Sequence, residues 1–119
     1  MSKDTFIKDM YAIIDARDSA GLANKMTENG IFRFANIPAV AGKEAITGFL
    51  DNFFQSIKAI RHENIEDWQV DDTRFATGLV TYTRHDDSEL KVPFSVILKM
   101  KAGLINEYLI FVDTSELYT

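Results

Sequence analysis

Two ionisable residues of this sequence are candidates for acid–base chemistry, His62 and Asp15. Neutral imidazole titrates near physiological pH, so His62 is able to accept or donate a proton at pH 7. Asp15 lies near the end of an amphipathic segment and is able to act as a base if it points into a cavity. The alternative for each is a solvated residue on a polar surface. The second histidine, His85, falls in a polar turn.

Three tyrosines and one serine are candidates for holding a ligand oxygen beside such a base. The hydroxyls of Tyr11, Tyr82 and Tyr108 are able to donate hydrogen bonds to a carbonyl group. Tyrosine also packs in cores with its hydroxyl bonded to the backbone, so both roles stay open. Ser95 is able to orient a ligand oxygen, but no histidine and carboxylate at a recognisable spacing mark it as a nucleophile.

The sequence contains no pattern typical of a metal or cofactor site. Its two histidines are far apart, with neither HxH nor HxxxH spacing, and it has no cysteine. It also has no glycine-rich phosphate loop. We therefore expect no metal and no cofactor.

Composition excludes several classes of protein. The net charge is −5 and the 13 basic residues are scattered, which argues against a nucleic-acid surface. No apolar run approaches the roughly 20 residues of a membrane span, and the first residues resemble neither a secretory nor a transit peptide. With 119 residues the chain is predicted to be one domain, residues 1–119, soluble and cytoplasmic.

Apolar spacing predicts three helices followed mostly by strands. The helices are expected over residues 5–17, about 19–25 and about 43–57, the second capped by Asp18 or Ser19. One short strand, residues 31–35, lies between the second and third helices. The remaining strands are expected over residues 62–70, 75–83, 90–101 and 104–113. This order is typical of an α+β fold.

The last two strands flank Ala102-Gly103, a two-residue loop typical of a β-hairpin. If Lys101 faces Leu104 across the turn, the register places Ser95 opposite Ile110. The side chains that then point toward the helices include small ones, so the inner face is expected to be recessed. Either the third helix fills that recess as plain core, or an aromatic-lined pocket for a small ligand remains. The residues predicted to line the pocket are Tyr11, Phe32, Phe34, Phe49, Phe53, Trp68, Tyr82, Ser95, Ile97, Tyr108 and Ile110.

The opposite face of the predicted sheet is uniformly bulky, and no helix remains in the sequence to cover it. An exposed apolar patch of that size marks an interaction surface. We therefore predict a homodimer that forms sheet against sheet. The residues assigned to its interface are Leu79, Phe94, Val96, Leu109 and Phe111.

The order of these features resembles the nuclear transport factor two-like superfamily, in particular its SnoaL-like polyketide cyclase and ketosteroid isomerase-like members. The resemblance rests on the IFRF strand, the loop with Pro38, the helix opened by Gly42-Lys43-Glu44-Ala45-Ile46, and a closing strand from Gly103 to Asp113. It implies a cone in which a curved antiparallel sheet wraps around a long helix and opens to an apolar pocket, often in a dimer.

Function is not fixed by this resemblance, because the fold carries both enzymes and non-catalytic binders. The carboxylate base of ketosteroid isomerases would fall near Arg33 or Phe34, and neither is a carboxylate. Asp113 matches an aspartate common at the end of the family's last strand, but the register turns it away from the pocket. We expect a binder of a small, mostly apolar molecule, polycyclic or ketone-bearing. The alternatives are a cofactor-free isomerase, cyclase or dehydratase using His62 or Asp15 with a pocket tyrosine, and an interaction module.

Overall fold

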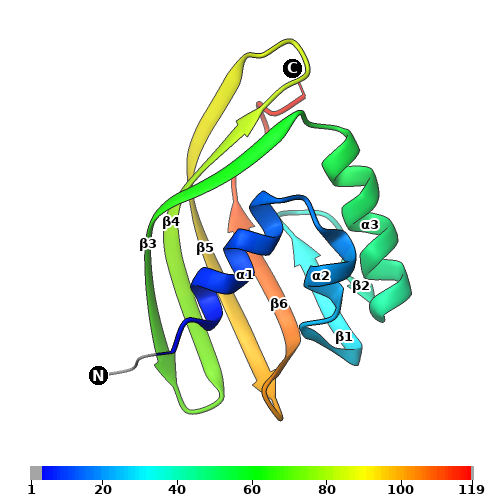
Figure 1. Cartoon of the computed structure of the whole chain (residues 1–119), viewed down its shortest axis with the longest axis vertical. Helices are drawn as coiled ribbons and strands as arrows, with labels where there is room; N and C mark the ends of the chain where they lie inside the picture. Colours follow the sequence, from blue (N-terminus) through cyan, green and yellow to red (C-terminus); the bar gives the residue numbers. More distant parts are fainter. Residues whose placement is uncertain (1–3, 119) are drawn as a thin grey trace.

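The computed structural model describes residues 4–118 and consists of three helices packed on one face of a six-stranded sheet (Figure 1). The helices are α1 (Phe6–Asp15), α2 (Ser19–Ala23) and α3 (Lys43–Gln55), and the strands are β1 (Met26–Phe34), β2 (Val40–Ala41), β3 (Ala59–Val70), β4 (Thr73–Thr83), β5 (Glu89–Lys101) and β6 (Leu104–Val112). The predicted α+β class and the three helices are confirmed. No helix in this described range is long and apolar enough to cross a membrane.

The strand order is β2-β1-β6-β5-β4-β3, and the sheet is curved and does not close. All neighbouring strands are antiparallel except β1 and β6, which run parallel. The core therefore lies between the concave face of the sheet and the helices. Its largest fully buried side chains include Tyr108, Met10 and Leu22.

Two strands begin earlier than the sequence predicts. β1 starts at Met26, not at residue 31, and Met26 pairs with Ile105 before an irregularity that precedes Ile31. Polar residues 27–29 break the apolar alternation there, which hides the first half of the strand from a pattern search. β3 starts at Ala59 and lies at the edge of the sheet, as predicted for a polar strand.

The hairpin of β5 and β6 has the predicted turn but not the predicted register. Lys101 does face Leu104, yet Asn106 forms a bulge, so Ser95 lies opposite Phe111 and not opposite Ile110. β5 is also shifted by one residue against β4, where Glu89 pairs with Thr83. Because side chains alternate along a strand, a slip of one residue turns every side chain of β5 to the other face. The predicted orientation of β5 is therefore wrong, whereas that of β4 and of residues 108–112 of β6 is right.

Candidate functional site

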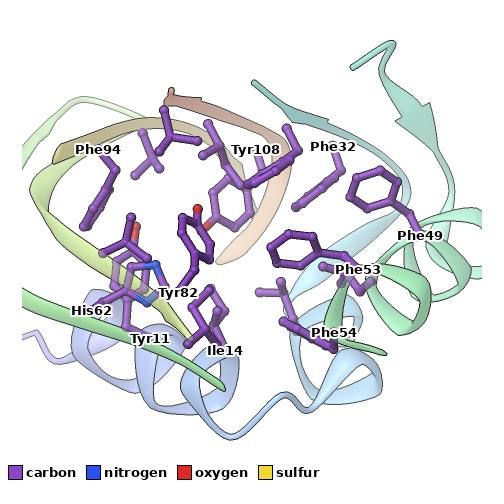
Figure 2. Close-up of a pocket in the computed structure, with 18 residues that line it drawn as sticks. Tyr11, Ile14, Phe32, Phe49, Phe53, Phe54, His62, Tyr82, Phe94 and Tyr108 are labelled. Atoms are coloured by element: carbon purple, nitrogen blue, oxygen red, sulfur yellow. The ribbon is translucent and has the colours of Figure 1, made fainter. Parts of the chain in front are cut away.

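A small cavity lies between the helices and the concave face of the sheet (Figure 2). Its lining is almost entirely aromatic and aliphatic, and its volume is about 40 Å³. Nine residues predicted from the sequence as catalytic or ligand-binding lie in its wall. They are Tyr11, Phe32, Phe34, Phe49, Phe53, His62, Tyr82, Tyr108 and Ile110.

The other predicted ligand-binding residues lie on the convex face. Ser95 is exposed and Ile97 is half-buried, because the slip of β5 turns both away from the helices. Trp68 pairs with Phe75 on β4, and its side chain is 52% exposed. The prediction that these three side chains point into the cavity is wrong.

Phe94 and Val96 occupy the inner positions of β5 instead. They are 4% and 2% exposed and line the cavity, so their assignment to a dimer surface is also wrong. The sequence does contain a signal for this: the apolar residues Ile105 and Tyr108 are three positions apart, separated by Asn106 and Glu107. The two polar residues between them break the period of two and indicate a bulge.

Asp15 and His62, predicted as separate alternatives, form one hydrogen-bonded pair. His62 Nδ1 lies 2.6 Å from Asp15 Oδ1, and the backbone N–H of His62 donates to Asp15 Oδ2 at 3.0 Å. The His62 side chain is 9% exposed and that of Asp15 is 27% exposed. Asp15 lines an outer groove between α1 and β3, and His62 lies between that groove and the cavity.

This pair is built at an unfavourable position for a carboxylate. Asp15 is the last residue of α1, where the partial negative charge of the helix dipole repels an anion. The two hydrogen bonds from His62 offset that repulsion. Since the carboxylate accepts, Nδ1 of His62 carries the proton, and Nε2 makes no hydrogen bond within residues 4–118.

Aromatic rings fix the imidazole from two sides. Tyr11 lies one helical turn before Asp15, and its ring centroid is 4.3 Å from that of His62. The ring of Phe94 meets His62 edge to face, with centroids 5.1 Å apart. These contacts limit the rotation of His62 and hold its ring in the cavity wall.

Three tyrosine hydroxyls supply most of the other polar atoms of the lining (Figure 2). Burial raises the pKa of Tyr11 well above its usual range, and the nearby Tyr108 hydroxyl raises it further. Burial likewise raises the pKa of Tyr82 and of Tyr108. The Tyr11 hydroxyl has no hydrogen-bond partner of good geometry among the described residues. All three tyrosines are therefore neutral hydrogen-bond donors at pH 7.

Gly78 makes room for this arrangement. It pairs with Phe94 across β4 and β5, and a Cβ atom at position 78 would lie 2.9 Å from the Phe94 ring. It would also lie 2.8 Å from the carbonyl oxygen of Glu63, which precedes a bulge in β3 at Asn64 (φ 55°). The ring of Phe94 occupies the space that the absence of a side chain at Gly78 leaves.

No cluster of three or more His, Asp or Glu side chains suited to a metal ion occurs in the described part of the chain. The polar groups at the cavity are the Asp15–His62 pair and the tyrosine hydroxyls.

The three helices and the curved, open sheet match the cone-shaped fold of nuclear transport factor two-like proteins. Comparison with known families shows to which family of this fold the chain belongs. Residues 7–108 match the SnoaL-like domain. The chain belongs to the SnoaL-like family, as the sequence resemblance predicts. No curated protein matches it.

Solved structures agree with this assignment. ActVI-ORFA from Streptomyces coelicolor is 26% identical, with a TM-score of 0.74 over 92% of this chain and 93% of that chain. A candidate polyketide cyclase from Pseudomonas putida KT2440 is 15% identical, with a TM-score of 0.85 over 98% and 96% of the two chains. TerC, co-crystallised with polyporic acid, is 18% identical, with a TM-score of 0.81 over 94% and 92%.

Proposed function

We propose that this protein binds a small, mostly apolar molecule with a carbonyl group in its aromatic cavity and transfers a proton on it without a cofactor. The observation that carries the proposal is the hydrogen bond of 2.6 Å between Asp15 and His62 in the cavity wall. A histidine that only covers the surface needs no carboxylate partner on its ring nitrogen, whereas a general base needs one nitrogen oriented and the other free.

In the proposed reaction, His62 Nε2 takes a proton from the carbon next to the ligand carbonyl. The electron pair of that C–H bond moves into the adjacent C–C bond, and the carbonyl oxygen becomes an enolate oxygen. Tyr11 donates its unpartnered hydroxyl to this oxygen, while Asp15 stabilises the imidazolium that His62 becomes. Return of the proton to a different carbon completes an isomerisation, and attack of the enolate carbon on a second carbonyl completes a cyclisation.

The size of the cavity sets a condition for binding. About 40 Å³ accommodates a few water molecules, whereas pockets for ring-containing ligands measure roughly 300–1,000 Å³. The wall has to move to admit such a ligand. Phe49 and Phe53 of α3 are only half-buried, so we expect their rings to move when a ligand enters.

The proposal is tested with 2-tetralone, a bicyclic ketone, in D₂O. Exchange of its α-protons for deuterium, followed by NMR, reports proton abstraction without knowledge of the natural product. We expect the wild type to accelerate exchange and His62→Gln to lower that acceleration by roughly two to four orders of magnitude. His85→Gln, which changes an exposed histidine whose ring forms a hydrogen bond with the Gln55 carbonyl, is the matched control.

Titration of 2-tetralone into both proteins separates the two candidate functions. A protein that only binds the ketone, favoured by the mostly apolar lining, would show saturable binding in wild type and His62→Gln alike and no accelerated exchange. Acceleration that survives in His62→Gln would contradict the role of His62.

We also retain the proposal of a homodimer through the convex face, with corrected residues. Leu79, Leu109 and Phe111 stay in the interface, and Phe111 is 54% exposed. Phe75, Ile97 and Trp68 replace the two buried side chains of β5, because cross-strand pairing places them in one row with Leu109. A cytoplasmic location stays a prediction.

A further inference from the structure

The cavity reaches solvent at one place besides the groove at His62. Most of its lining residues are buried, but besides His62 four are half-buried: Phe49, Phe53, Ile110 and Val112. The first two lie on α3 and the other two at the end of β6. The mouth of the cavity therefore lies between α3 and the last residues of β6.

Residues 113–118, here called the strap, begin at this mouth. The strap leaves β6 after Val112 and folds into a turn in which the Leu117 N–H donates to the Thr114 carbonyl at 3.0 Å. The side chain of Leu117 is 1% exposed and belongs to the hydrophobic core. Because burial of an apolar side chain stabilises the fold, the strap is anchored to the core and does not lie loosely on the surface.

Arg84, directly after β4, holds the strap by two hydrogen bonds, here called the latch. Its Nε donates to the Leu117 carbonyl at 2.9 Å, and its second terminal nitrogen donates to the Glu116 carbonyl at 2.8 Å. On the other side, the Tyr118 hydroxyl bonds to Ser56 Oγ at 2.7 Å, directly after α3. The strap thus joins the sheet to the C-terminal end of α3, whose last turns carry Phe53 and Phe54 of the cavity wall.

The strap lies outside residues 7–108, the part of the chain that matches the SnoaL-like domain. Figure 1 shows the end of the chain beside the tip of the β4–β5 hairpin and the end of α3.

We propose that the strap, latched by Arg84, controls the rate at which ligands enter and leave the cavity. The inference rests on the proposed function only in that a ligand occupies the cavity, and it does not involve the catalytic role of His62. Enlarging the cavity requires α3 and its rings to move away from β6. That motion pulls the Ser56 end of the strap away from the Arg84 end, so the latch has to open first.

The experiment uses N-phenyl-1-naphthylamine, a neutral apolar probe that fluoresces when buried, with association and dissociation followed by stopped flow. Arg84→Ala removes both charged hydrogen bonds to the strap, together with the one that Arg84 donates to Ser88 Oγ, and we expect both rates to rise roughly tenfold or more. Because the latch is closed in both the free and the bound protein, Kd should change less than about threefold. Arg84→Lys, which keeps the charge but only one of the two bonds, should fall between wild type and Arg84→Ala.

Lys58→Ala is the matched control, because it removes an exposed ion pair with Asp87 close to the latch and leaves the strap bonds in place. Hydrogen exchange at the Leu117 amide reports whether the latch has opened. Faster Leu117 exchange with unchanged probe rates would overturn the proposal.

The proposal can still be tested if the Arg84→Ala variant does not fold or if the probe does not bind. If Arg84→Ala fails to fold, the same comparison is made with Arg84→Lys. If the wild type does not bind the probe, cavity binding itself fails, and amide exchange of Phe53 and Phe54 then tests the strap alone. Faster exchange at these two amides in Arg84→Lys supports the latch, and unchanged exchange overturns it.

Discussion

Replacing Gly78 by alanine should destabilise the protein and disturb the site at the same time. The added Cβ would lie 2.8 Å from the Glu63 carbonyl oxygen and 2.9 Å from Phe94 Cε2. Both distances are too short for a carbon atom, so something must shift. The Glu63 oxygen is backbone next to the bulge of β3, so the Phe94 ring is the group that moves, toward Tyr11 and His62.

The expected change in unfolding free energy for Gly78→Ala is the difference between two opposing effects. Overpacking a close-packed site costs about 1–3 kcal/mol. Removing the backbone freedom of a glycine from the unfolded chain returns about 0.5–1 kcal/mol. The net loss of unfolding free energy should therefore be about 1–2 kcal/mol, which lowers Tm by roughly 5–10 °C in a domain of this size.

Gly48→Ala is the matched control. No atom lies within 4 Å of a Cβ added at this exposed position of α3, so the same chemical change should stabilise by about 0.5–1 kcal/mol. Urea and thermal unfolding of both variants measure whether each substitution lowers or raises the unfolding free energy. A Gly78→Ala protein as stable as the wild type would refute the close packing of β3, β4 and Phe94 described above.

Two further predictions concern pH and assembly. Burial raises the pKa of Tyr11, Tyr82 and Tyr108, so the folded chain keeps three protons that the unfolded chain loses above about pH 10. The contribution of these tyrosines to the unfolding free energy should therefore be full below pH 10. Above pH 10 the unfolding free energy should fall by up to ~4 kcal/mol per pH unit. Denaturant unfolding between pH 8 and 11 measures this loss, and a flat profile would show that these hydroxyls are not buried. Phe111→Glu should convert the predicted dimer to the 13.5 kDa monomer in light scattering, whereas Ile37→Glu, at an exposed loop residue, should not. A wild-type monomer at micromolar concentration would contradict the dimer.

Local signals account for the parts of the fold that the sequence predicts. Asp18 does cap α2, accepting from the Gly21 N–H at 2.9 Å. Ala102 and Gly103 have positive φ, as a two-residue hairpin turn of this type requires. The periodicity of the helices needs no knowledge of distant residues, so their positions follow from the chain itself.

The orientation of β5 could not be extrapolated from its turn. The register from Lys101 holds for two pairs and then changes at Asn106, whose side chain bonds to Thr27 on β1. That partner comes from a strand far away in sequence. One inserted residue was enough to exchange Phe94 and Ser95 between the two faces.

The pairing of Asp15 with His62 also depends on tertiary structure. The two residues are 47 positions apart, and they meet because α1 packs on β3. Each was recognisable as an ionisable group near the cavity, but no spacing in the chain indicates that one orients the other. The same holds for the free Tyr11 hydroxyl, since its burial is set by β5 and β6.

The most direct test of the central claim is the tautomer of His62, measured by long-range ¹H–¹⁵N NMR at pH 8, with His85→Gln to assign the signals. If Asp15 orients the imidazole as described, Nδ1 carries the proton and Nε2 is unprotonated. A neutral His62 with its proton on Nε2 would contradict the account, because the nitrogen that faces the ligand would then be unable to act as a base.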